Sequence, residues 1–354
     1  MLANSKHIIE EASLQSSENG IRLEILRDLE NINSLAEKWD TLVKASNCNR
    51  AFSSFTWYQK TYVIDQSLQA LVILAYRNED LVGILPLAHH VKYDQLMFPS
   101  NLCDYSDMII KKNDRNVGMM LLNCLMDLED HYKNILLKCL RSDSNLTNAI
   151  SSHLQMQKYS SCFSQITRFN CPYIKLPSTI EDFLSSKSKS FRYDIKRKEK
   201  KAAQLGYETV LLDPHIFPAD DLPRHFLRLH EARLGEKSGL VTIQDVRAFI
   251  SATFPILFKK GTLLPFALMH ENKVMGMHIY MLGPDGLAYW NGGFDPEVSK
   301  LSPGTLTFMA AIRHTINMGL TEFDLLRGEE AYKLKWNTNT RILSQFNSQN
   351  KTAL

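Results

Sequence analysis

Two stretches of equal length decide the fold of this chain, Leu71–Leu87 (LVILAYRNEDLVGILPL) and Leu264–Tyr280 (LPFALMHENKVMGMHIY). In each stretch a polar break separates two apolar, β-prone segments, which is typical of a β-hairpin. A constant offset of 193 residues aligns the stretches without a gap and places Gly83 on Gly276. They therefore predict two antiparallel hairpins of the same kind.

The sequence after each hairpin repeats the same order of elements. Gly118 opens a predicted helix that precedes an apolar strand at Ile135–Leu137, and Gly304 opens one that precedes Phe323–Leu326. An ordered repeat of hairpin, helix and strand indicates duplication. We therefore predict a mixed α/β fold with two tandem lobes, at roughly 21–165 and 166–347.

Hydrophobic periodicity predicts the other elements of the first lobe and one strand of the second. The expected strands are Ile21–Arg27, Tyr132–Leu140, Ser160–Arg168 and Leu287–Trp290, and the expected helices are Leu29–Lys44, Trp57–Val63, Asn116–Glu129 and Asn145–Gln157. Residues 1–20 are polar and lack the apolar stretch of a secretory signal, so we expect a disordered tail and a cytoplasmic location.

Composition excludes several classes of protein. The longest apolar runs, Ala70–Ala75 and Leu81–Ala88, are far shorter than the roughly 20 residues of a membrane helix, so no membrane span is expected. Forty-one Lys and Arg against 38 Asp and Glu give a net charge of only +3, which argues against a global attraction to DNA. Six scattered cysteines without metal-ligand spacing predict buried free thiols and no metal site.

The charge run of the chain is Lys187–Lys201. Eight basic and two acidic residues give this segment a local charge of +6, while Phe191 and Ile195 supply an apolar stripe. The pattern predicts a helix with one docked face and one cationic face. That face is either simply solvated or a binding wall for a phosphorylated ligand.

The segment Leu287–Ile316 carries the strongest local argument for a ligand site. A predicted strand ends at Asn291-Gly292-Gly293, and a helix then begins at Pro303-Gly304 after Lys300. The free N–H groups of a first helical turn, together with the helix dipole, can bind a diphosphate. A capped helix after a loop explains the same residues without a ligand.

Acid–base candidates follow the next predicted strand and occur on one helix. Asp324 lies between Phe323 and Leu325 at a strand end, where it is either a general base or a structural hydrogen-bond acceptor. His230 is a second candidate because histidine titrates near neutral pH. The motifs of α/β-hydrolases, zinc proteases, P-loop proteins and Rossmann dinucleotide sites are absent from the sequence.

Several motifs together resemble those of the CelD-like acetyltransferases of cellulose and exopolysaccharide biosynthesis, a group of the GNAT superfamily distantly akin to the FemABX peptidoglycan aminoacyl transferases. The likeness spans about residues 21–345. The motifs are Phe52–Trp57 (FSSFTW), Leu81–Leu87 (LVGILPL), Ser106-Asp107, Phe191-Arg192, Leu229-His230, Ser302–Gly304 (SPG) and Phe323–Lys333 (FDLLRGEEAYK).

This resemblance implies tandem GNAT lobes of which the C-terminal one binds acetyl-CoA or another acyl-CoA as co-substrate. The positions that match the donor-binding pattern are Gly292, Gly293, Lys300, Leu301, Ser302, Gly304 and Thr305. Lys300 stands where the family has Gln or Arg, and Pro303-Gly304-Thr305 replaces its glycine pair. The helix start at residue 304 thus becomes the predicted diphosphate site.

The resemblance also implies direct acyl transfer to an amine or hydroxyl within a ternary complex, with Asp324 as the first choice of base and His230 as the second. The residues expected to bind CoA phosphates or an anionic acceptor are Arg192, Arg327, Tyr332, Lys333 and Lys335. The expected acceptor is a sugar, a nucleotide sugar, another polysaccharide precursor or an amine. The alternatives are a FemABX-like transferase that uses aminoacyl-tRNA and a binding module without catalysis.

Overall fold

The computed structural model describes residues 20–99, 102–155, 163–336 and 338–348. The tail expected over residues 1–20 lies outside these ranges apart from Gly20, and so does Cys162. Both predicted hairpins are present, because a short turn joins two long antiparallel strands in each place. The predicted mixed α/β class is confirmed.

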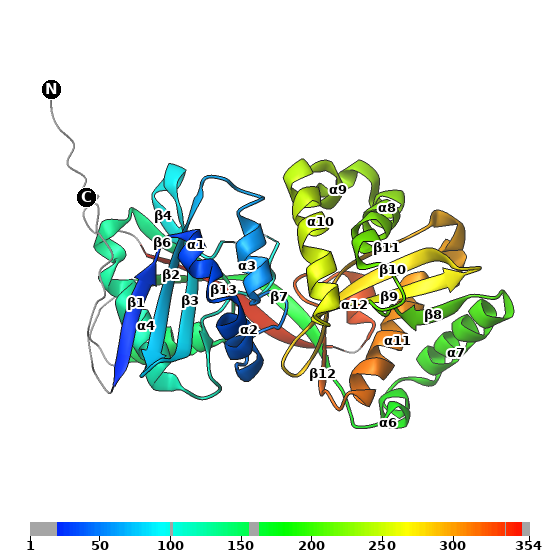
Figure 1. The fold of residues 1–354 in the computed structure, drawn as a ribbon. Helices are drawn as coiled ribbons and strands as arrows, with labels where there is room; N and C mark the ends of the chain where they lie inside the picture. The colour runs from blue at the N-terminus through cyan, green and yellow to red at the C-terminus, as the bar shows by residue number, and fades with distance from the viewer. Residues whose placement is uncertain (1–19, 100–101, 156–162, 337, 349–354) are drawn as a thin grey trace.

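Thirteen strands of the described residues form one mixed sheet (Figure 1). Its order is β1-β2-β3-β4-β6-β13-β7-β12-β11-β10-β9-β8, with β5 beside β3. The strands are β1 (Ile21–Leu26), β2 (Leu68–Arg77), β3 (Asp80–His90), β4 (Gln95–Met97), β5 (Ile109–Ile110), β6 (Asn134–Arg141), β7 (Phe163–Lys175), β8 (Glu208–Leu211), β9 (Leu263–His270), β10 (Lys273–Leu282), β11 (Gly286–Phe294), β12 (Glu322–Asp324) and β13 (Asn339–Ser348).

The two ends of this sheet repeat one set of strand directions. We call β1–β6 with their helices the N-terminal half and β8–β12 with theirs the C-terminal half. In the N-terminal half β1 to β4 are antiparallel neighbours and β4 is parallel to β6. In the C-terminal half β8 to β11 are antiparallel neighbours and β11 is parallel to β12. The duplication predicted from the hairpins therefore extends through the sheet.

The halves meet at two long strands, β7 and β13, which are exchanged between them. β13, from the end of the chain, pairs with β6 of the N-terminal half, while β7, from the middle, pairs with β12 of the C-terminal half. β13 and β7 also pair with each other along almost their whole length, and they form the bridge at the centre of Figure 1. The predicted boundary between residues 165 and 166 falls inside β7.

Helices cover both faces of each half, so each half has three layers. In the N-terminal half α1 to α3 pack on one face and α4 and α5 on the other. In the C-terminal half α8 and α10 pack on one face, and α6, α7 and α11 on the other. The helices are α1 (Leu29–Asn33), α2 (Ala36–Ala45), α3 (Phe55–Thr61), α4 (Arg115–Asp127), α5 (Asn145–Gln155), α6 (Ile180–Ser185), α7 (Lys189–Gln204), α8 (Leu222–Leu234), α9 (Gly239–Thr242), α10 (Gln244–Lys259), α11 (Pro303–Asn317) and α12 (Ala331–Leu334).

The single helix predicted over Leu29–Lys44 is wrong, because the structure divides it into α1 and α2. The backbone N–H groups of Ser34 and Leu35 bond the carbonyls of Asn31 and Ile32, three residues back, which interrupts the α-helical ladder. The apolar spacing of the segment does not reveal this break, because both short helices bury the same face.

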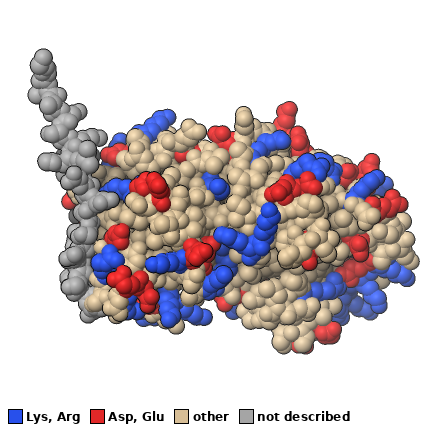
Figure 2. Space-filling view, viewed as in Figure 1, with Lys and Arg blue, Asp and Glu red and all other residues tan. Residues whose placement is uncertain are grey.

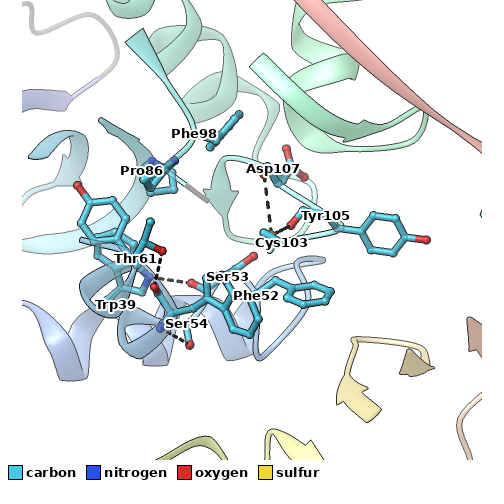
Figure 3. Close-up of a pocket in the computed structure, with 14 residues that line it drawn as sticks. Trp39, Phe52, Ser53, Ser54, Thr61, Pro86, Phe98, Cys103, Tyr105 and Asp107 are labelled. Carbon is cyan, nitrogen blue, oxygen red and sulfur yellow. Dashed lines mark hydrogen bonds between the residues drawn. The ribbon is translucent and has the colours of Figure 1, made fainter. Parts of the chain in front are cut away.

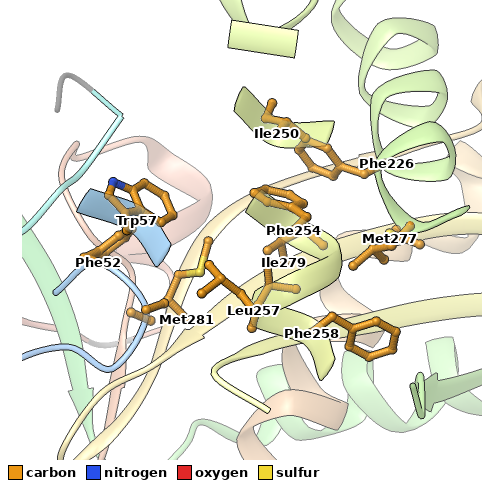
Figure 4. Close-up of a cluster of buried hydrophobic side chains, with 14 of the residues drawn as sticks. Phe52, Trp57, Phe226, Ile250, Phe254, Leu257, Phe258, Met277, Ile279 and Met281 are labelled. Atoms are coloured by element: carbon orange, nitrogen blue, oxygen red, sulfur yellow. The ribbon is translucent and has the colours of Figure 1, made fainter. Parts of the chain in front are cut away.

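A buried contact joins the two halves on the α3 side of the sheet. Phe52 and Trp57 belong to the same apolar cluster as residues of α8, α10 and β10, and Figure 4 shows them facing that cluster. The rings of Trp57 and Phe249 lie 5.1 Å apart. Lys260 of the C-terminal half also pairs with Asp40 at 2.7 Å. The halves are therefore packed together and not merely tethered.

The described cysteines agree with the predicted buried thiols. Five are free, four of them are buried, and Cys139 is half-buried. Within the described ranges no helix is both long and apolar enough to cross a membrane.

The glycines that the offset of 193 aligned have equivalent places in the two halves. Gly83 lies in β3 under α4, where a Cβ would be 2.4 Å from Cγ1 of Val117. Gly276 lies in β10 under α11, where a Cβ would be 3.3 Å from Cβ of Pro303. In both halves a helix begins close above the second hairpin strand, and glycine makes room for it.

We therefore expect Gly83→Ala to lower the free energy of unfolding by about 1–3 kcal/mol, because the new methyl group overlaps buried Val117. Urea unfolding measures this loss. Adding Val117→Ala should give less than the sum of the two single losses, because it removes the overlapping atom. Gly118→Ala is the matched control, since its Cβ meets only flexible side-chain ends at 3.3 Å or more. Strict additivity of Gly83→Ala and Val117→Ala would contradict this account.

Candidate active site

A wedge opens in the C-terminal half where β11 and β12 diverge. The two strands pair only from Gly286 to Ala288 on β11 and from Glu322 to Asp324 on β12. In the part of the chain that the structure describes, β11 then continues to Phe294 with only β10 beside it. The start of α11 lies beyond its far end, and the segment around α12 follows β12. We call this opening the β11/β12 wedge.

His278 of β10 lies at the far end of the wedge, between two glycines that the sequence analysis singled out. A Cβ on Gly292 would be 1.9 Å from the His278 ring, and one on Gly304 would be 3.2 Å from its Cε1. Nδ1 of His278 lies 2.8 Å from the hydroxyl of Thr307. Burial lowers the pKa of His278 to about 3, so the imidazole is neutral near pH 7. Sequence reasoning missed this residue, because only the register of β10 and β11 places it opposite Gly292.

Close packing explains both glycines of β11. A Cβ on Gly293 would be 2.3 Å from backbone atoms of Leu229 and His230, so α8 lies directly on the strand. The Gly292 N–H donates to the side chain of Asn291, and the Gly292 carbonyl accepts from Arg233 at 3.4 Å. Neither glycine needs a ligand to account for its presence. Donor binding by Gly292 and Gly293 stays a prediction.

Arg233 brings a cation to the same end of the wedge. Its guanidinium lies 5.3 Å from the ring of Phe294 and contributes to lowering the pKa of His278. The side chain is exposed, and it makes no ion pair with the described residues. Sequence reasoning missed Arg233, although it lies one turn after His230 on α8.

The start of α11 offers fewer free amides than the sequence suggested. Pro303 has no N–H, and the N–H groups of Thr305 and Leu306 both donate to the Ser302 carbonyl. In the described residues, Gly304 has the one N–H of this turn that remains available. Lys300 is exposed just before it, whereas Leu301 and Thr305 are buried. An anion here would meet one amide, the helix dipole and nearby cations.

The two predicted bases lie apart, and both are engaged. Asp324 accepts hydrogen bonds from Tyr105 at 2.8 Å and from the Leu326 N–H at 2.7 Å, and it pairs with Arg341 at 3.1 Å. Burial raises its pKa, although Arg341 acts in the opposite direction. His230 contacts the Gly292 carbonyl and the Ser238 hydroxyl through its two ring nitrogens, and burial lowers its pKa.

The two residues lie beside different parts of β11. Asp324 is paired with Ala288, whereas His230 contacts Gly292, four residues or about 13 Å further along the strand. Asp324 and His230 therefore do not form one acid–base pair. Their roles as bases stay predictions.

Asp104 is a further carboxylate, and it comes from the N-terminal half. Its loop lies across β11, since the Leu102 carbonyl accepts from the indole N–H of Trp290 at 3.2 Å. Oδ1 of Asp104 pairs with Nε of Arg327, just after β12. Oδ2 accepts no hydrogen bond from the residues that the structure describes. Burial raises the pKa of Asp104 to about 6, although Arg327 acts in the opposite direction. Asp104 is two residues before the Ser106-Asp107 motif, which was the only sequence signal near it.

The predicted substrate-binding residues fall into two groups. Arg327 and Lys333 come together beside Asp104, and Lys333 donates to the Arg327 carbonyl at 2.7 Å. Tyr332 lies instead beside Tyr289 of β11. Arg192 instead donates to the Lys187 carbonyl at 2.8 Å, at the end of α6. Lys335 lies beyond, 6.0 Å from the ring of Trp336. Only the first group borders the wedge, and the binding roles of both groups stay predictions.

A hollow between α3 and residues 98–99 and 103–107 is too small for a substrate. Its volume is about 30 Å³, which is room for one water molecule. Figure 3 shows its walls, with Trp39 and Thr61 on one side and Cys103 and Asp107 on the other, and with Tyr105 pointing out of it.

The comparisons with known proteins agree with this geometry. Residues 189–334, which hold the β11/β12 wedge, match the family model described as an acetyltransferase (GNAT) domain. The N-terminal half repeats its strand order, which confirms the predicted tandem GNAT-like fold. No curated protein matches the chain.

Several solved structures share the fold over nearly the whole chain. FemX has a TM-score of 0.65 at 12% identity, with 92% of this chain and 97% of that chain covered. L-PGS from Bacillus licheniformis has a TM-score of 0.58 at 11% identity, with coverage of 90% and 93%. The C-terminal domain of a putative lysylphosphatidylglycerol synthetase from Agrobacterium fabrum has a TM-score of 0.55 at 9% identity, with 90% of this chain and 92% of that chain covered. At these identities the likeness is one of fold, and the CelD-like grouping stays a proposal.

Burial of His278 makes a test by pH possible. Below its ordinary pKa of 6.5 the unfolded chain binds a proton that the folded protein excludes until about pH 3. Stability that is fully present above pH 6.5 is therefore lost as the pH falls toward 3, by up to about 1.4 kcal/mol per pH unit. The free energy of unfolding of His278→Gln should fall less steeply over this range in urea titrations. His215→Gln, at an exposed site, is the control. Equal slopes for His278→Gln and the parent protein would contradict the neutral, buried imidazole.

Proposed function

We propose that this protein is an acyl-CoA-dependent N- or O-acyltransferase, most simply an acetyltransferase, acting on a sugar, nucleotide sugar or amine. The observation that carries the proposal is the β11/β12 wedge inside the GNAT domain, with a cation and a free amide at one end and a carboxylate at the other. Direct transfer in a ternary complex suits this arrangement, because donor and acceptor can meet between the two ends.

The donor's diphosphate would lie at the far end of the wedge. Gly304 would donate its N–H, and Arg233 and Lys300 would supply positive charge, so the chemistry of these groups fits a dianion. The neutral ring of His278 adds no charge there but offers a polar nitrogen between Gly292 and Gly304. Acyl-CoA would supply the activated thioester carbonyl.

The acceptor would lose its proton at the other end of the wedge. Its nitrogen or oxygen would attack the thioester carbon, and the C–S bond would break with coenzyme A leaving as the thiolate. A carboxylate would take the proton from the attacking group. We place this role on Asp104, because its pKa of about 6 leaves it ionised at pH 7 and none of the described residues donates a hydrogen bond to its Oδ2. Asp324 is the second choice, since Tyr105, Leu326 and Arg341 already occupy its oxygens.

The cationic face of α7 favours the FemABX-like alternative, transfer from aminoacyl-tRNA. Lys196, Lys200 and Lys201 are exposed there, and Tyr193 among them is 70% exposed. Blue side chains gather over this helix at the lower right of Figure 2. Such a face could contact an RNA backbone, and the affinity would then fall steeply with salt. Salt-dependent tRNA binding without any response to acyl-CoA would favour this second function.

Acetyl-CoA should raise the melting temperature, because a ligand that binds only the folded state adds about 1.4 kcal/mol at ten times its Kd. Gly304→Glu and Arg233→Glu should each remove this shift by placing an anion at the diphosphate end. Arg224→Glu, on an exposed part of the same helix as Arg233, is the matched control and should keep it. Differential scanning fluorimetry provides the measurement. No shift with any acyl-CoA would refute the acyl-CoA proposal.

Asp104→Asn should lower kcat/KM for acetyl transfer by about 10²-fold or more, since general-base catalysis contributes 10²–10⁴-fold. In the parent protein kcat/KM should rise with a midpoint near pH 6, as Asp104 ionises, and this rise should be lost in the variant. The assay uses whichever amino sugar or amine gives turnover in a panel. Glu329→Gln, an exposed carboxylate beyond Arg327, should behave like the parent. If Asp104→Asn keeps the rise and Asp324→Asn loses it, Asp324 is the base.

A further inference from the structure

The N-terminal half contains its own wedge, at the place equivalent to the β11/β12 wedge. β4 and β6 pair only from Gln95 to Met97 and from Asn134 to Leu136, and then diverge. A cavity of about 470 Å³ lies where they separate, a size typical of small-molecule sites. Its lining includes Phe98, Lys138, Cys139, Phe169, Arg327 and Leu343. We call it the β4/β6 cavity.

One part of this cavity is apolar and open to solvent. Phe98 and Leu343 are buried, but Phe169 of β7 keeps 44% of its surface exposed. Phe169 pairs across the sheet with Leu343, so both side chains lie on the same face. Exposed aromatic surface of this kind is costly in water, and covering it with an apolar group is favourable. The wall therefore suits the apolar body of a ligand.

Two cations, Lys138 and Arg327, also line the cavity. Lys138 is exposed and has no acidic partner within the described ranges. The guanidinium of Arg327 lies 5.6 Å from the ring of Phe169, which brings this cation against the apolar wall. Asp104 neutralises Arg327 only from the Nε side. A neutral apolar ligand would leave Lys138 without an ion-pair partner, whereas an anionic head between the two cations would pair with it.

We propose that the β4/β6 cavity is a second ligand site, which binds an amphipathic anion: a phosphate or carboxylate head held by Lys138 and Arg327, and an apolar body lying on Phe98 and Phe169. Arg327 touches both this cavity and Asp104, so the bound head lies next to the proposed base. The ligand is therefore placed as the acyl acceptor, an assignment that rests on the proposed function, whereas the binding itself does not.

Octyl phosphate is the probe, because it joins a phosphate head to an apolar chain. Titration calorimetry measures its Kd, and peptide mass spectrometry measures how far it slows alkylation of Cys139, which lines the cavity. Inorganic phosphate and 1-octanol test the head and the chain separately. Lys138→Glu and Phe169→Ser change the exposed walls. The matched controls are Lys133→Glu, just before the strand that holds Lys138, and Ile342→Ser, which is exposed on the opposite face of β13 from Leu343.

We expect octyl phosphate to bind at least tenfold more tightly than phosphate or 1-octanol and to protect Cys139. Lys138→Glu and Phe169→Ser should each weaken binding at least tenfold and remove the protection, and both controls should stay within twofold of the parent protein. Unprotected Cys139, equal binding of 1-octanol, or equal losses in the control variants would overturn the site. If binding holds but no acyl-CoA shifts the melting temperature, the site stands and its role as acceptor site falls.

Discussion

The carboxylate of Asp324 is the contact on which the arrangement of the two halves depends. It lies on β12 and joins Arg341 of β13 to Tyr105 of the N-terminal half. Arg341 also pairs with Glu322 of β12, so these contacts link β13 to β12 across β7, which lies between them in the sheet. Removing one partner of such a buried pair costs about 3–5 kcal/mol, because the other charge is left unpaired. The hydrogen bond from Tyr105 to Asp324 also holds the loop with Asp104 over the β11/β12 wedge.

Much of the fold was predictable from local sequence pattern. Hairpins and amphipathic helices are encoded in neighbouring residues, and the offset that aligned Gly83 with Gly276 reflects one packing requirement met twice, a helix lying close above a hairpin strand. The exchange of β7 and β13 was not predictable, because it pairs residues far apart in sequence and both strands have ordinary β-strand composition. The break between α1 and α2 was hidden by a continuous apolar face.

The candidate site was less predictable, because register and burial decide what each residue can do. In the sequence, a glycine that contacts a ligand cannot be told from a glycine that allows close packing. Only the positions of His278 and α8 show that Gly292 and Gly293 have the packing role. Arg233 and Asp104 come to the wedge from α8 and from the other half of the protein, without a motif to mark them. Asp324 was predicted because it ends a strand, but the structure shows its carboxylate engaged by Arg341 and Tyr105.

The central claim is that the β11/β12 wedge holds an acyl-CoA donor with its diphosphate at the start of α11. A crystal structure of the protein with coenzyme A tests it most directly. The account predicts the diphosphate within hydrogen-bond distance of the Gly304 N–H and the Arg233 guanidinium, with the thiol directed toward Asp104. Coenzyme A bound elsewhere on the molecule, with the wedge closed by its own side chains, would contradict it.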